Sequence, residues 1–181
     1  MEILDIYDKY RNLTGKKILK ENYNSLNNDE FTIFSYAVIF NQENEMLIQK
    51  RNSELNKYPN FWDLSVNGNV YSGETTFETI ERILFEEYGY EHNFLDERPY
   101  LTINSDKKFC DVYIINNNID INILKLDYKK IQNVTWATKD EILQLIDEAR
   151  FVPYERSFIE LLFFNKDTRG VIIGEKWWKN N

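Results

Sequence analysis

The sequence predicts an α/β fold, in which a sheet with buried central strands packs against amphipathic helices. Residues 31–40 are apolar at nearly every position, as expected for a strand that is buried on both faces. Further along, four large apolar side chains recur at steps of three and four residues, the period of a one-sided helix: Phe77, Ile80, Leu84 and Tyr88. A buried strand and a one-sided helix in the same chain together predict the α/β class.

Polar runs and turn residues divide the segment before this helix into shorter elements. In order, they predict a hairpin over 3–20 with its turn at Asn12–Gly15, a loop over 21–30, strands over 31–40 and 45–51, a loop over 52–60 and a short strand over 62–66.

Beyond the helix, the same signals predict strands over 99–104 and 108–116, an Asn- and Lys-rich loop over 117–130, a strand over 133–137, and helices over 139–149 and 154–165. The tail, 167–181, contains Val171, Ile172 and Trp178 and could pack on the domain or on a partner chain. No repeat or linker divides the chain, so we expect one domain over 1–181, with the hairpin and loop in 1–30.

Composition excludes several classes of function. The 181 residues include 30 acidic and 22 basic side chains, which gives a formal net charge of −8. This net charge argues against general binding of nucleic acids, which requires a basic patch. No apolar run is long enough to span a membrane, and the acidic start lacks a signal segment, so we expect a cytoplasmic protein. Cys110 is the only cysteine, which excludes an intrachain disulfide.

Residues 68–90 are the most informative segment. Gly68 and Gly73 bracket a short loop in which the backbone can turn freely and approach a ligand closely. Thr75 or Thr76 can cap the helix that follows, and Gly89 can end it in the left-handed conformation. The pattern therefore predicts a loop and a helix with defined ends.

The acidic face of this helix is a candidate metal site. Glu86 and Glu87 lie in its last turn, where the helix dipole is also negative, and a divalent cation would relieve that conflict. Arg82 lies four residues from both Glu78 and Glu86 and can brace these carboxylates. A helix with several glutamates is more often a solvated face, so the composition alone leaves both interpretations open.

The spacing of the segment resembles the Nudix box, G-x5-E-x7-R-E-U-x-E-E-x-G-U, where U is aliphatic. Seven positions fall in register: Gly68, Glu74, Arg82, Leu84, Glu86, Glu87 and Gly89. The layout from residue 3 to about 165 is similar to the isopentenyl-diphosphate-isomerase-like branch of that family. The resemblance implies an α/β/α sandwich with a mixed central sheet, Mg²⁺ or Mn²⁺, and hydrolysis of a diphosphate linkage in a nucleoside diphosphate derivative.

Four departures from the pattern qualify the resemblance. Ile83 stands where the family has the first Glu of R-E-x-x-E-E, and Lys130 stands near a place where the branch often has a Glu. Residues 31–40 lack histidines, and 62–68 lack the cysteine of the isomerases, which argues against isomerase chemistry. The rival hypothesis is a degenerate Nudix module that binds a nucleotide or a protein partner without hydrolysis.

The resemblance also implies roles for single residues. Glu86 and Glu87 would hold the metal, Glu74 would support the loop or a second ion, and Arg82 would orient the carboxylates. Arg51, at a strand end, could bind a phosphate or be a surface residue, and Trp62 could stack on a base, although a core position is the more common alternative. Glu97, Asp106 and Asp111 are weaker candidates as metal ligands, and His92 has no expected role. A homodimer is compatible with the sequence.

Overall fold

The principal sheet is built around a long strand, β3 (Thr32–Phe40). The computed structural model describes residues 2–91 and 98–167. The main order is β5 (Trp62–Asp63), β4 (Met46–Arg51), β3, β8 (Lys108–Asn116) and β7 (Leu101–Ser105), while β6 (Val66–Asn69) pairs with β3 and β9 (Ile131–Ala137) pairs with β4. Because β3 runs parallel to β8 but antiparallel to β4 and β6, the sheet is mixed, as predicted.

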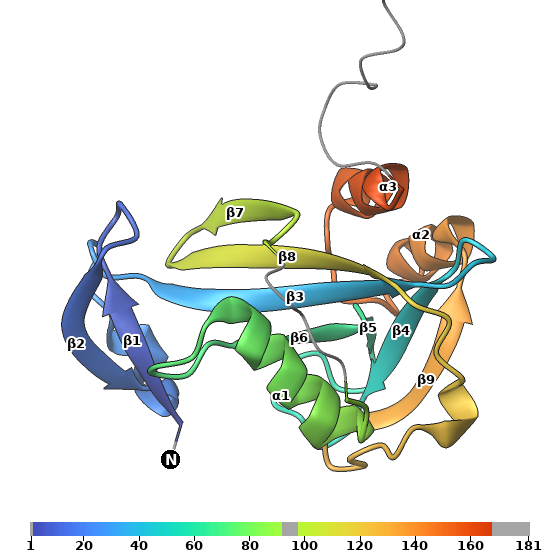
Figure 1. Ribbon diagram of the computed structural model, residues 1–181, viewed down its shortest axis with the longest axis horizontal. Coiled ribbons are helices and arrows are strands. Elements are labelled where there is room, and N and C mark those ends of the chain that lie inside the picture. Colours follow the sequence, from blue (N-terminus) through green and yellow to red (C-terminus); the bar gives the residue numbers. More distant parts are fainter. Residues whose placement is uncertain (1, 92–97, 168–181) are drawn as a thin grey trace, which may run out of the picture.

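Helices cover both faces of this sheet (Figure 1). One face packs against α1 (Thr76–Tyr88), and the other packs against α2 (Lys139–Asp147) and α3 (Arg156–Asn165). Side chains alternate along β3, so that Ala37 and Ile39 join the core under α1 while Val38 and Phe40 join the core under α2 and α3. The predicted α/β/α sandwich is confirmed.

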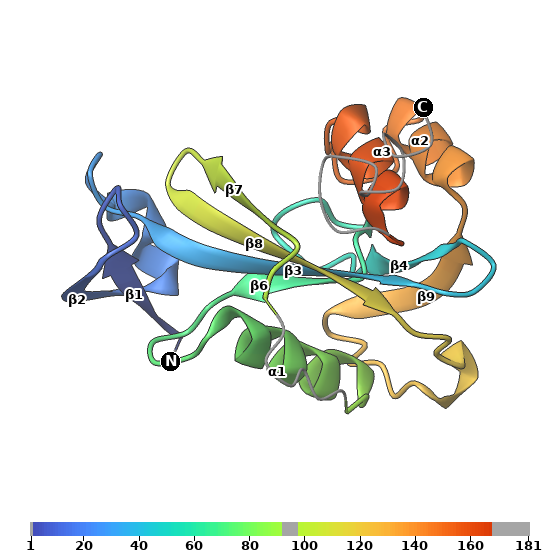
Figure 2. The same ribbon diagram turned by 45° about the horizontal axis from the view of Figure 1, so that its top comes forward.

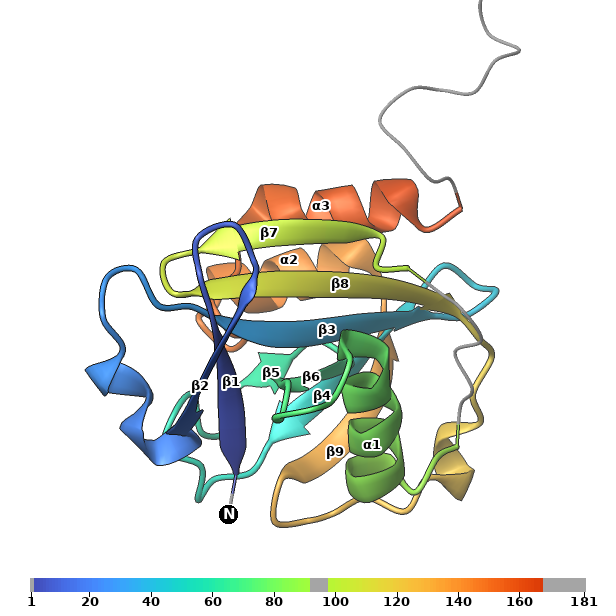
Figure 3. The same cartoon turned by 60° about the vertical axis from the view of Figure 1, so that its left-hand side comes forward.

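The predicted N-terminal hairpin is present as β1 (Ile3–Tyr7) and β2 (Leu13–Leu19), beside the start of β3 (Figure 3). Two short 3-10 helices occupy segments that were predicted as loops: η1 (Lys20–Ser25) and η2 (Ile121–Ile123). A single 3-10 turn buries no regular apolar stripe, so hydrophobic periodicity does not reveal it.

The predicted strand at 62–66 is split into β5 and β6 by the side chain of Ser65. Its hydroxyl accepts a hydrogen bond from Ile39 N at 2.9 Å and donates one to Leu47 O at 2.5 Å. The side chain thus takes the place of strand-to-strand hydrogen bonds at this point. Gly68 consequently lies in a strand rather than in the predicted loop.

Among the helices of the described ranges, none has the length and apolar character needed to cross a bilayer. The described range ends at residue 167, so the rest of the tail, like His92 and Glu97, lies outside it.

Candidate functional site

Helix α1 has the ends that the sequence predicts. Thr75 is its N-cap: the side chain accepts a hydrogen bond from Glu78 N, and the Glu78 carboxylate accepts one from Thr75 N at 2.7 Å. Gly89 closes the helix with φ of 61°. The capping box engages Glu78, so the expectation that Arg82 braces Glu78 is wrong.

The loop between β6 and α1 is fastened to the N-terminal hairpin. Asp5 accepts hydrogen bonds from Ser72 Oγ at 2.9 Å and from Gly73 N at 3.0 Å. Tyr71 donates its hydroxyl to Glu2, and Ser72 N donates to Ile3 O. Gly73 has φ of 88°, which only glycine adopts readily. The role of Asp5 could not be predicted from the sequence, because no local pattern links it to residues nearly 70 positions away.

Arg82 is the central residue of the loop–helix junction. Its Nε lies 2.6 Å from Glu74 Oε1 and its NH2 lies 3.0 Å from Glu74 Oε2, a two-pronged ion pair. The guanidinium also stacks on the ring of Tyr71, with Cζ 3.9 Å from the centroid, and NH1 reaches Glu86 Oε2 at 3.4 Å. Arg82 therefore orients two of the three predicted carboxylates.

Glu74 is saturated by protein donors. Besides Arg82, it accepts hydrogen bonds from Tyr71 N at 3.0 Å and from Thr79 Oγ1 at 2.8 Å. Burial alone would raise the pKa of Glu74, but these hydrogen bonds outweigh it and leave the pKa below its ordinary value. The arrangement favours support of the loop over binding of a second ion.

Glu87 is in the opposite situation. Its carboxylate forms no hydrogen bond or ion pair with any described residue. Burial raises the pKa of Glu87 to about 7, and the nearby acids Asp127 and Glu86 act in the same direction, while Lys130 lowers it. Next to it, Glu86 is exposed, apart from its long contact with Arg82. The pair thus combines one desolvated and one accessible carboxylate.

Ile83 occupies the place next to these carboxylates. The side chain is 3% exposed and belongs to the core under α1. It packs directly on Gly68: a Cβ added there would lie 2.5 Å from Ile83 Cδ1. Gly68 has no positive φ, so its value is close approach rather than turning. The isoleucine therefore fills space between helix and strand with apolar atoms.

The loop before β9 packs on the end of α1. Lys125 N donates to Tyr88 O at 2.8 Å, and Asp127 N donates to Glu87 O at 2.9 Å, so carbonyls of the last turn are satisfied. Lys130 lies at the end of this loop and is near enough to lower the pKa of Glu87. A fixed positive charge thus lies close to the predicted metal ligands.

The two carboxylates fit a divalent cation only in part. Over residues 2–91 and 98–167, no group of three or more His, Cys, Asp or Glu is gathered for a metal. Glu86 and Glu87 could still hold Mg²⁺ or Mn²⁺, since Mg²⁺ binds through one or two carboxylates when phosphates complete its shell. The partly buried carboxylate of Glu87, which has no hydrogen-bond donor among the described residues, supports this fit. The residues suit a cation that is shared with a phosphorylated ligand.

The predicted substrate-binding residues are engaged in contacts within the protein. Arg51 donates to Asp63 Oδ2 at 3.0 Å and to Lys57 O, so its guanidinium is engaged within the protein. Trp62 packs against the core under α2 and α3. Asp63 also accepts from Tyr154 at 2.9 Å; burial raises the pKa of Asp63, and Arg51 and Tyr154 offset this only partly.

Of the weaker candidates, the two that lie in the described ranges, Asp106 and Asp111, do not form a group of three or more possible metal ligands with the carboxylate pair. Asp111 is buried and bound by Arg11, with NH1 to Oδ1 at 2.9 Å. Asp106 lies in the turn between β7 and β8. Cys110 is buried.

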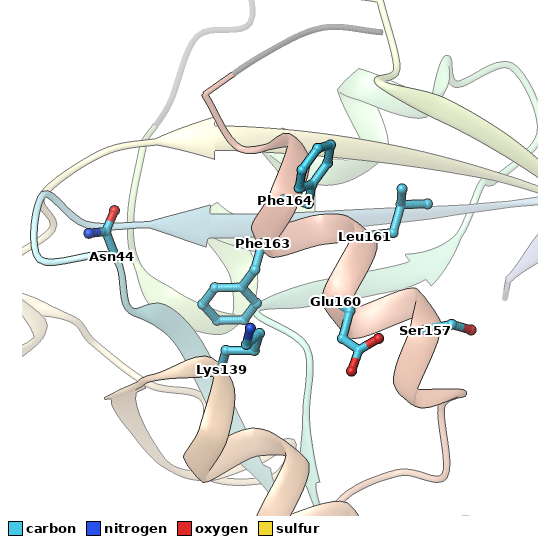
Figure 4. A pocket seen from close by; sticks show the side chains of 7 residues that line it. All are labelled: Asn44, Lys139, Ser157, Glu160, Leu161, Phe163 and Phe164. Atoms are coloured by element: carbon cyan, nitrogen blue, oxygen red, sulfur yellow. The ribbon is translucent and has the colours of Figure 1, made fainter. Parts of the chain in front are cut away.

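A hollow of about 700 Å³ lies on α3, far from these residues (Figure 4). Its walls come from the β3–β4 turn, α2 and α3, and Phe163 lies beside Lys139. It has no connection to the chemistry predicted for α1.

Known proteins resemble this chain in sequence. A family model described as NUDIX domain matches residues 34–162. The chain is 30% identical over 163 residues to an uncharacterized Nudix hydrolase of Listeria monocytogenes, across 90% of this chain and 94% of the relative. It is 28% identical to an uncharacterized Nudix hydrolase of Clostridium acetobutylicum, across 81% and 74%.

Solved structures share the fold. The crystal structure of DR0079 from Deinococcus radiodurans superposes with a TM-score of 0.72 at 24% identity, covering 89% of this chain and 97% of the other. A MutT protein from Methanosarcina mazei gives 0.53 at 21% identity, covering 75% and 95%.

Proposed function

Because this chain belongs to the NUDIX domain family, we propose that it hydrolyses a diphosphate linkage in a nucleoside diphosphate derivative, with Mg²⁺ or Mn²⁺ bound by Glu86 and Glu87. The family makes a hydrolase of the Nudix type the expected class. The substrate, the metal and the residues that act are the parts of the proposal that need a test.

The carboxylate of Glu87 is the observation that supports the proposal best. A partly buried acid without a hydrogen-bond donor among the described residues is costly to ionise, as its raised pKa shows. A cation at this position would supply the missing positive charge. The exposed carboxylate of Glu86 can then reach the same ion from the solvent side.

The remaining residues position this pair. Arg82 contacts Glu86 on one side and Glu74 on the other, and so links the loop, the helix and the exposed carboxylate. Asp5 fixes the loop from the hairpin. When bound, the metal would polarise a phosphoryl oxygen and lower the pKa of a coordinated water.

The test is phosphate release from nucleoside di- and triphosphates, nucleotide sugars and dinucleotides, with Mg²⁺, with Mn²⁺ and with chelator. Glu87→Gln keeps the shape of the side chain and removes its charge, so turnover should fall at least about a hundredfold. Glu160→Gln, at an exposed position on α3, is the matched control and should retain full activity. Turnover that survives in Glu87→Gln would exclude the proposed metal site.

A second candidate function is supported by two residues. Ile83 fills the place of a box carboxylate, and Lys130 puts a positive charge beside Glu87. Both changes weaken a cation site while leaving the fold intact, as expected for a module that binds a nucleotide without cleaving it. The same panel discriminates: thermal stabilisation by a nucleotide without turnover on any substrate would favour this candidate.

A further inference from the structure

Helix α3 has apolar side chains on two sides. Its inner side packs into the core under α2 and α3 with Ile159 and Leu162. A second stripe lies on its outer side, at the spacing of one helix face: Ser157, Glu160, Leu161 and Phe164. Leu161 is 40% exposed and Phe164 is 68% exposed. A helix that is apolar on both sides is normally covered on both sides.

This outer stripe forms one wall of the hollow described above. The other walls are Asn44, in the β3–β4 turn, and Lys139, at the start of α2 (Figure 4). Phe163 also lines the hollow, and its ring packs edge to face on Phe40, with centroids 4.9 Å apart. The hollow thus has an apolar wall that is anchored in the core, which suits apolar side chains.

The residues that follow α3 in the sequence have matching chemistry. Residues 168–181 contain five large apolar side chains within eight positions: Val171, Ile172, Ile173, Trp177 and Trp178. Removing such side chains from water is favourable roughly in proportion to their apolar area. Gly170 stands before the first of them, and glycine lets a chain reverse its direction at little steric cost.

The end of α3 brings this segment close to the stripe. Asn116 Nδ2 donates to Lys166 O at 3.0 Å, so the end of the helix is fixed to the end of β8. From Phe164 back to Ser157 the stripe is about 10 Å long, a distance that three or four extended residues span. A segment tethered so near has an effective concentration on the order of millimolar, which favours it over a second copy of the chain.

We propose that residues 168–181 fold back on α3 of the same chain and cover the outer stripe, with the apolar side chains of 171–178 on Leu161 and Phe164. Figure 2 shows α2 and α3 together on one side of the sheet and α1 on the other. The covered surface is therefore separate from the candidate metal ligands on α1, and the proposal does not depend on hydrolysis. It assigns the segment to its own domain and not to a partner chain.

The experiment uses trypsin, which cleaves after basic residues such as Arg169 and Lys176. Mass spectrometry follows cleavage at both residues in the whole chain, with a synthetic peptide of residues 166–181 as the unprotected standard. The wild-type chain should be cut at least about tenfold more slowly than the peptide, because cleavage follows the fraction of open segment. The double variant Leu161→Ser/Phe164→Ser should be cut about tenfold faster than wild type, since the apolar contact is lost.

The matched control is Phe85→Ser, which removes a ring of similar exposure, 60%, from α1. It should leave cleavage at Arg169 unchanged. Cleavage of the wild-type chain at the rate of the peptide, or equal cleavage of wild type and the double variant, would overturn the proposal. Protection that increases with protein concentration would also overturn it, because the cover would then come from a second copy.

A variant in the segment itself separates lost contact from unfolding. If the double variant unfolds, trypsin will also cut within the strands of the sheet. Ile172→Ser/Trp177→Ser then decides the question, because it changes no residue of the described domain. Faster cleavage of this variant at Arg169 would support the proposal, and an unchanged rate would count against it.

Discussion

Ile83 on α1 and Gly68 on β6 are in direct contact, with no room for a side chain at residue 68. The distance of 2.5 Å between Ile83 Cδ1 and a Cβ placed on Gly68 is shorter than real Cβ contacts allow. Helix α1 and strand β6 therefore approach each other closely at this point. The packing of this one pair underlies two of the predictions below.

Gly68→Ala should destabilise the protein through Ile83. Overpacking of this kind costs about 1–3 kcal/mol in the free energy of unfolding. Ile83→Val removes the clashing Cδ1, so the double variant should be more stable than the sum of the two single effects by at least about 0.5 kcal/mol. Urea denaturation of the four proteins measures this coupling. If the effects of the two single substitutions simply add, the added Cβ is accommodated by a movement of the backbone and not by Ile83.

Ile83→Glu should make stability depend on metal. Position 83 is 3% exposed, so an ionised glutamate there should cost about 2–4 kcal/mol in chelator. It lies one helical turn before Glu87, so Mg²⁺ should bind more tightly and restore part of the loss. Ile83→Gln is the control, with similar destabilisation and no response to Mg²⁺. Melting temperatures of both variants with and without Mg²⁺ measure this difference. Equal stabilisation of Ile83→Glu and Ile83→Gln by Mg²⁺ would refute a metal site in the last turns of α1.

Arg82→Lys should loosen the loop–helix junction. Lysine cannot reproduce the two-pronged contact with Glu74 or the flat stacking on Tyr71, so about 1–3 kcal/mol should be lost. Arg150→Lys, which disturbs one exposed ion pair with Glu148, should change stability by less than about 0.5 kcal/mol. The midpoints of denaturant unfolding of Arg82→Lys and Arg150→Lys, each against wild type, measure the two losses of stability. Similar effects at both positions would show that the Arg82 contacts add nothing to folding.

Glu87→Gln should stabilise the metal-free protein at high pH only. The pKa of Glu87 is raised from 4.5 to about 7 in the folded state, so the folded protein disfavours the charged form. The variant and wild type should match near pH 4, diverge between pH 4.5 and 7, and differ above that by at most about 3 kcal/mol. Saturating Mg²⁺ should reverse the order at pH 8. If the difference in unfolding free energy between Glu87→Gln and wild type did not change with pH, the raised pKa of Glu87 would be refuted.

The helix of the box was predictable because its signals are local. Thr75, Gly89 and the apolar stripe stand within 15 residues of one another, and each has one physical meaning. The partners of the polar side chains were harder. Glu78 could turn to the cap or to Arg82, and sequence spacing allowed both. Arg51 was placed correctly at a strand end, but its binding to Asp63 depends on how β4 and β5 meet.

Contacts between distant segments were beyond the reach of sequence patterns. The docking of Asp5 on the box loop, the splitting of a strand by Ser65 and the position of Lys108 over the Phe34 ring all arise from tertiary packing. Orphan polar atoms such as Thr32 Oγ1 become visible only when every neighbour is in place. The sequence indicates which residues have chemistry to offer, and the fold decides which of them are left free to use it.

The bonds from Asp5 to Ser72 and Gly73 set an order of assembly. The loop and the hairpin are far apart in the chain, and strand β3 lies between them in sequence, so closing this contact costs loop entropy that only a partly built sheet can offset. Because Glu74 belongs to this loop, we expect Arg82 and Glu74 to take their final places after the loop is held. The candidate site should thus be among the last regions to become rigid during folding, and among the first to loosen when the hairpin is disturbed.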